Sequence, residues 1–238
     1  MILEVVVYNI ESALKALEGG ADRIELCASP GDGGTTPSYG TIEVVRQHVS
    51  MDLFVMIRPR GGNFLYSSYE FHAMKRDITQ CQRLSADGVV LGILTSDGRI
   101  DKQRCKELVD RAKPMRVTCH RAFDCTRDPF EALEDCIEIG FDRILTSGQK
   151  NTAFEGVGLL TQLVKKANGR IVIMPGSGVN EKTVIPIVQQ TQVKEVHFSA
   201  AIPGNETMKY FNPIIEGMGN ARTVDPDIIR KIRSLLSN

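Results

Sequence analysis

Eight short hydrophobic runs recur along the chain, separated by longer amphipathic segments. Most of these runs are rich in β-branched residues and are apolar at nearly every position. Such continuous apolarity is typical of strands buried on both faces, as in a parallel sheet. The predicted strands lie at residues 2–7, 22–26, 53–57, 87–91, 115–119, 142–146, 170–174 and 194–198.

The segments between these strands carry signals for the starts and ends of helices. Ser67 and Glu70 have the spacing of a capping box. A capping side chain precedes a proline at Thr36-Pro37, Asp128-Pro129 and Asp225-Pro226, and glycines suited to helix ends occur at 19–20, 140 and 169. We expect helices at 9–19, 37–49, 68–84, 101–113, 153–168 and 181–190, with two more starting at 129 and 226.

The alternation of eight strands with eight helices predicts a single (β/α)8 TIM barrel over residues 1–238, a length within the range of that fold. The sequence G-A-D-R-I at 20–24 is repeated as G-F-D-R-I at 140–144, and A-D-G-V occurs at 86–89. These repeats lie at strand starts, so we interpret them as stabilising the bottom of the barrel. A long irregular segment after strand 8, residues 199–224, is typical of a functional loop, an interface or a mobile stretch.

Composition restricts the function. Lys plus Arg equals Asp plus Glu at 29 each, so no basic field is present to attract nucleic acid or a membrane surface. The first residues do not resemble a signal peptide, and no apolar run approaches the roughly 20 residues that span a bilayer. The six cysteines form no C-x-x-C pair. We therefore expect a cytoplasmic protein with reduced thiols, and no nucleic-acid or membrane partner.

Ionisable residues gather at the predicted carboxyl ends of the strands, where barrel proteins build their sites. Buried Glu and Arg are costly unless they pair with one another or with a ligand. We predict a site at the barrel mouth, and the alternative is a structural lattice of salt bridges that fills it. The catalytic candidates are Glu25, His120 and Asp124, and the ligand-binding candidates on strands and loops are Arg58, Arg60, Arg121, Ser147, His197 and Ser199.

Two glycine-rich stretches offer further candidates. Gly176, Ser177 and Gly178 follow strand 7, where barrels often bind phosphate through backbone N–H groups. The alternative is a tight turn that needs glycine only for its backbone angles. The loop at 27–36 is longer than a minimal connection, so it is a candidate lid, or else an ordinary surface loop.

A metal site is a further hypothesis. Cys27, His120 and His197 all fall at strand ends. A thiolate with imidazoles would suit Cu(I) or zinc. The alternative for Cys27 is an inert buried side chain.

Six sequence blocks, in order over nearly the whole chain, resemble the CutC family. They are I-E-L-C at 24–27, G-G-T-T-P-S at 33–38, V-M-I-R-P-R-G at 55–61, T-C-H-R-A-F-D at 118–124, L-T-S-G at 145–148 and M-P-G-S-G-V at 174–179. The resemblance implies a cytosolic (β/α)8 barrel, a homodimer or higher homo-oligomer, and a role in copper tolerance or Cu(I) binding. In the family that role relies on two cysteines; Cys27 matches the second, and Val6 stands at the first.

Two functions therefore remain open. The first is a copper homeostasis protein that binds Cu(I). The second is an enzyme or binding protein for a small anionic, phosphorylated metabolite, with Glu25 and His120 as acid and base. A scaffold acting through its oligomer surface is a third.

Overall fold

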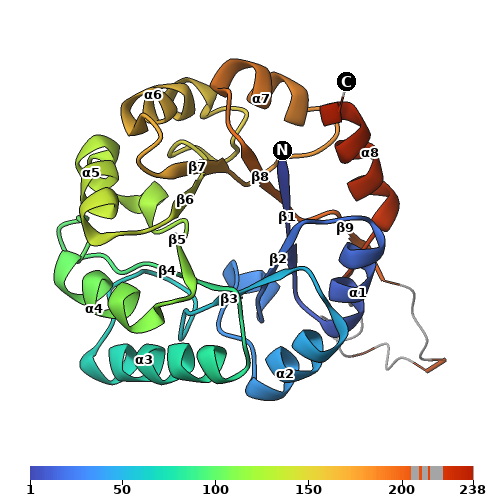
Figure 1. The fold of residues 1–238 in the computed structure, drawn as a ribbon, viewed down its shortest axis with the longest axis horizontal. Coiled ribbons are helices and arrows are strands. Elements are labelled where there is room, and N and C mark those ends of the chain that lie inside the picture. Colours follow the sequence, from blue (N-terminus) through green and yellow to red (C-terminus); the bar gives the residue numbers. More distant parts are fainter. Residues whose placement is uncertain (205–208, 211–213, 215–221, 238) are drawn as a thin grey trace.

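The computed structural model describes residues 1–204, 209–210, 214 and 222–237. Eight parallel strands form one sheet in the order β7-β6-β5-β4-β3-β2-β1-β8. Because β8 pairs with β1 and packs against β7, the sheet curls into the predicted barrel (Figure 1). The strands are β1 (Ile2–Val7), β2 (Arg23–Leu26), β3 (Asp52–Met56), β4 (Gly88–Leu91), β5 (Arg116–Cys119), β6 (Arg143–Thr146), β7 (Val172–Pro175) and β8 (Glu195–Phe198).

The helices surround this sheet on the outside (Figure 1). They are α1 (Ile10–Glu18), α2 (Tyr39–His48), α3 (Ser68–Arg83), α4 (Lys102–Ala112), α5 (Pro129–Ile139), α6 (Val157–Ala167), α7 (Val184–Thr191) and α8 (Pro226–Ser237). The capping box of Ser67 and Glu70 is confirmed. The predicted start of α2 after Thr36 is wrong, because the Thr36 hydroxyl accepts a hydrogen bond from the Arg58 N–H and Ser38 caps the helix instead. Helices α6 and α7 also begin later than predicted.

The bottom of the barrel is filled by buried ion pairs around one aromatic ring. The Arg23 guanidinium bonds to both Glu4 and Glu195, and Arg143 Nε lies 3.1 Å from Glu195 Oε2. Both guanidinium groups lie over the Phe54 ring, with their Cζ atoms 4.8 and 4.9 Å from its centroid. Mutual pairing thus offsets the cost of burying these charges.

The aspartates of the repeated strand-start motif have one role in common. Each carboxylate accepts a hydrogen bond from a backbone N–H near the start of the preceding odd-numbered strand. The pairs are Asp22 with Leu3 at 2.8 Å, Asp87 with Leu53 at 2.8 Å, and Asp142 with Val117 at 2.7 Å. The interpretation of this repeat as a stabilising feature is therefore confirmed.

The segment after β8 is only partly described. Strands β9 (Ala201–Pro203) and β10 (Arg222–Val224) pair antiparallel, and β10 packs against α1. Most of the predicted irregular segment between them lies outside the described residues, as does any interface it forms. Within the described part of the chain, no helix has the length and apolarity needed to cross a membrane.

All six cysteines are free thiols. Cys81, Cys105 and Cys136 are buried in α3, α4 and α5, where they pack in the core. Cys125 is exposed.

Candidate functional site

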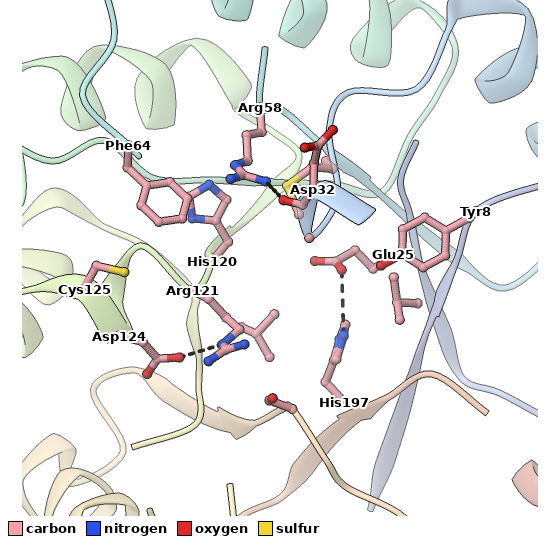
Figure 2. Close-up of a pocket in the computed structure, with 15 residues that line it drawn as sticks. Tyr8, Glu25, Asp32, Arg58, Phe64, His120, Arg121, Asp124, Cys125 and His197 are labelled. Atoms are coloured by element: carbon pink, nitrogen blue, oxygen red, sulfur yellow. Dashed lines mark hydrogen bonds and ion pairs between the residues drawn. The ribbon is translucent and has the colours of Figure 1, made fainter. Parts of the chain in front are cut away.

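A pocket of about 380 Å³ opens at the carboxyl ends of the strands (Figure 2). The structure brings seven of the predicted site residues to its wall: Glu25, Arg58, His120, Arg121, Asp124, Ser177 and His197. The lining residues that were not predicted for the site are Val6, Tyr8, Asp32, Gly33, Met56, Phe64, Cys125 and Leu145. The charged side chains from distant parts of the sequence therefore share one cavity.

Glu25, His197 and Glu4 form a buried cluster on one side of this pocket. Glu4 and His197 are register partners on β1 and β8, and His197 Nδ1 lies 2.7 Å from Glu4 Oε1. The other ring nitrogen, Nε2, faces Glu25 Oε2 at 3.8 Å (Figure 2). The second Glu25 oxygen, Oε1, is buried and has no hydrogen-bond partner among the described residues. One donor atom from each residue lies within 4.8 Å of the others.

The protonation of this cluster follows from burial and from its neighbours. Burial raises the pKa of Glu4, but the hydrogen bond from His197 and the charge of Arg23 outweigh it and lower the pKa to about 2. Burial raises the pKa of Glu25 to about 7, and the nearby Glu4 charge contributes, although His197 opposes the shift. For His197, burial lowers the pKa, but the two carboxylates raise it above its usual value. Glu4 is therefore an anion that orients His197 toward Glu25.

Cys27 lies next to this cluster but does not line the pocket. Its thiol is 1% exposed and donates a hydrogen bond to Glu25 Oε2 at 3.6 Å. Burial, followed by the charge of Glu25, raises the pKa of the thiol well above its usual value. The loop after β2 covers Cys27 so closely that a Cβ at Gly34 would lie 3.1 Å from the sulfur. This loop is the predicted lid, and its bridge between Ala28 and Thr35 closes it into an ordered turn.

Arg58 lines the pocket beside the loop after β2 and is 5% exposed. Its guanidinium donates to three backbone carbonyls, those of Asp32 at 2.6 Å, Gly34 at 2.7 Å and Gly62 at 2.8 Å. The Nε atom is buried without a partner within the described part of the chain. Arg58 thus holds the loop after β2 in place through its Nη atoms, and its Nε–H donor makes no hydrogen bond among the described residues.

His120 stands beside Arg58, and its ring lies 4.9 Å from that of Phe64. The Ala122 N–H donates to His120 Nδ1 at 3.2 Å, so the ring proton resides on Nε2. That Nε2 is buried and has no partner among the residues described. Burial, and then the charge of Arg58, lower the pKa of His120 to about 3. His120 is therefore a neutral hydrogen-bond donor at physiological pH.

Arg121 and Asp124 form an ion pair at the rim, with Arg121 Nε 2.8 Å from Asp124 Oδ2. The Asp124 carboxylate also accepts hydrogen bonds from the Thr146 hydroxyl, the Ser147 N–H and the Gln149 N–H. Through these bonds Asp124 positions Arg121 and the loop after β6. Asp124, predicted as a catalytic candidate, lines the pocket with its carboxylate held by these donors.

Other predicted residues do not line the pocket. Arg60 points away from it and pairs with Glu70 at 2.6 Å. Ser147 donates to the Lys150 carbonyl and accepts from Arg121 at 3.0 Å. Ser199 is exposed.

The glycine-rich turn after β7 is used for packing. The Gly176 N–H donates to the Thr146 carbonyl at 3.0 Å, and a Cβ there would lie 2.4 Å from Leu145. Ser177 donates its hydroxyl to the Asn151 carbonyl at 2.8 Å, and Gly178 packs against Thr152. The Gly176 N–H is therefore not available to a phosphate.

The alternation of side chains along β1 could have identified one further pocket residue from the sequence. Tyr8 follows Glu4 and Val6 at intervals of two, which places all three on the inner face of β1 and its extension. Phe64 and Cys125 lie in loops, where no periodicity locates a side chain.

Comparison with known proteins agrees with this fold. The model of the CutC family matches residues 1–202. The chain belongs to the CutC family. A copper homeostasis protein cutC homolog from Homo sapiens is 48% identical over 211 residues, which cover 89% of this chain and 77% of that protein. A CutC family protein from Parabacteroides distasonis is 50% identical over 212 residues, 89% of this chain and 87% of the relative.

Solved structures agree as well. The crystal structure of a protein from Streptococcus agalactiae, described as a copper homeostasis protein CutC, has a TM-score of 0.80 and 35% identity, and covers 84% of this chain and 98% of that one. Thiamine phosphate pyrophosphorylase from Pyrococcus furiosus has a TM-score of 0.61 at 16% identity over 99% of this chain and 95% of the other. The second likeness reflects the barrel fold alone.

Proposed function

We propose that this protein acts in copper homeostasis and binds a copper ion at the barrel mouth, beside Glu25 and His197. Its relatives in Homo sapiens and Mus musculus are named copper homeostasis proteins. The observation that carries the proposal is the environment of Glu25. One of its buried oxygens lacks a partner among the described residues, and the other lies 3.8 Å from His197 Nε2 and 3.6 Å from Cys27 Sγ.

The donor atoms around Glu25 suit a copper ion. Glu4 holds His197 through Nδ1, the arrangement in which a carboxylate orients a metal-binding imidazole. Met56 belongs to the same buried cluster as Cys27, and its Cε would lie 3.5 Å from a Cβ at Gly34, so its thioether is a further candidate donor. Thiolate and thioether sulfur favour Cu(I), whereas imidazole and carboxylate also accept Cu(II).

The pair of cysteines that the family resemblance implies is incomplete here. Val6 stands at the first position and lines the pocket, in register with Glu25. Copper binding by this chain would therefore use sulfur, nitrogen and oxygen donors together. In that case both Cys27 and His197 are needed.

Metal titration tests the proposal. Purified protein is titrated with Cu(I) under anaerobic conditions against a chromophoric chelator, and separately with Cu(II) by calorimetry. We expect binding of copper that weakens roughly 10- to 100-fold in Cys27→Ser and in His197→Gln. Cys81→Ser, which alters a buried thiol in α3, is the matched control and should bind as the wild type does. Absence of binding, or equal affinity in all four proteins, would contradict the proposal.

We further propose that the protein is cytoplasmic and forms a homodimer or higher homo-oligomer, as the family resemblance implies. Light scattering on the purified chain tests the second point. The alternative function, recognition of a small anionic metabolite, is favoured by a separate observation at Arg58.

A further inference from the structure

Arg58 differs from the other deeply buried arginines of this barrel. Arg23 and Arg143 are 1% and 3% exposed, and each pairs with a carboxylate. Arg58 is 5% exposed, yet its guanidinium bonds to three backbone carbonyls and interacts with the Tyr66 hydroxyl, and it pairs with no carboxylate among the described residues. A buried charge without a counter-charge is costly. The described residues supply no anion for Arg58, so a bound ligand would have to supply it.

His120, beside Arg58, also lacks a hydrogen-bond partner for one of its donors. Its Nε2–H is a second buried donor without an acceptor in the described part of the chain. Both side chains line the same pocket, and Figure 2 shows the guanidinium and the imidazole next to one another, with Phe64 beyond. An unpartnered His120 donor and an arginine that pairs with no carboxylate, both on the wall of one cavity, indicate a missing acceptor oxygen.

The rim adds a third cationic group. Arg121 lines the pocket, and its pairing with Asp124 fixes its position at the edge. The Asp124 carboxylate itself accepts hydrogen bonds from the Thr146 hydroxyl and the Ser147 N–H, at the start of the loop after β6. Arg58, His120 and Arg121 therefore supply donors to one pocket, which the carboxylates of Glu25, Asp32 and Asp124 also line.

We propose that Arg58, His120 and Arg121 form a subsite for the oxyanion group of a small molecule, either a phosphate or a carboxylate. Arginine and neutral histidine together present N–H donors that suit such oxygens. The pocket volume of about 380 Å³ leaves room for a small metabolite that carries the group. This subsite is separate from the Gly176–Gly178 turn, where phosphate binding was predicted from sequence.

Calorimetric titration of the full chain with inorganic phosphate, and in parallel with acetate, tests this subsite at constant ionic strength. We expect saturable binding of at least one of the two anions, and a preference between them identifies the group. Removal of one donor to an anion should weaken binding roughly tenfold or more. His120→Asn keeps an acceptor near the Ala122 N–H and removes the Nε2 donor, so it should show this loss.

Arg58→Lys should show the same loss, and Arg60→Lys is the matched control, since Arg60 lies two residues away but bonds to Glu70 outside the pocket. Thermal melts of each variant establish that it is folded. The proposal is overturned if neither anion binds the wild type, or if His120→Asn binds as tightly as the wild type. Copper titration of His120→Asn should be unchanged, so a failure here is distinguishable from a failure of the copper proposal.

Discussion

The buried His120 makes the stability of this protein depend on pH in a calculable way. Its pKa is lowered from 6.5 to about 3, first by burial and then by the charge of Arg58. Between these values the unfolded chain binds a proton at this position and the folded chain does not. Stability is therefore fully present above pH 6.5 and falls as the pH decreases toward 3, by about 1.4 kcal/mol per pH unit.

The substitution His120→Asn removes this titration. When the pH falls from 7.5 to 5, the unfolding free energy of the wild type should decrease by about 2 kcal/mol because of this histidine. The variant should not show this part of the decrease. The assay is urea unfolding of both proteins at several pH values in this window, in buffers free of phosphate and carboxylate. The difference in unfolding free energy between wild type and variant should narrow by that amount as the pH falls.

The control is His72→Asn, at an exposed position on α3. Its difference from the wild type should stay constant, since it alters nothing in the barrel. If the unfolding free energies of the wild type and His120→Asn changed in parallel with pH, the reasoning would be refuted. Such a result would mean that His120 takes up a proton in the folded state and is not the neutral donor described above.

Three further predictions concern packing, charge and exposure. Gly88→Ala places a Cβ 2.5 Å from the ring of Phe54, so we expect a loss of about 1–3 kcal/mol in urea unfolding, and a loss under about 0.5 kcal/mol would contradict the packing. Glu195→Gln leaves Arg143 without its buried partner and should cost about 3–5 kcal/mol; near-neutral stability would show that the pair is dispensable. A small alkylating reagent should label Cys125 in the native protein, as judged by peptide mass spectrometry, and labelling of the other thiols before unfolding would contradict their burial.

Part of the candidate site followed from local rules. Residues two apart on a strand share a face, so Glu25 could be placed next to Cys27 from sequence. The same rule does not hold for Arg58 and Arg60. Strand β3 ends at Met56, and in the turn that follows the alternation no longer holds, so Arg58 enters the pocket and Arg60 leaves it.

The sequence by itself determined the barrel. Strand burial and helix capping depend on neighbouring residues, and the order of eight such units leaves few other folds. Only the tertiary structure decided which groups meet. Glu4 and His197 are 193 residues apart and touch because β8 closes against β1, and Phe64 reaches His120 from a loop without periodicity. Contacts of this kind depend on closure of the whole sheet, which no local pattern encodes.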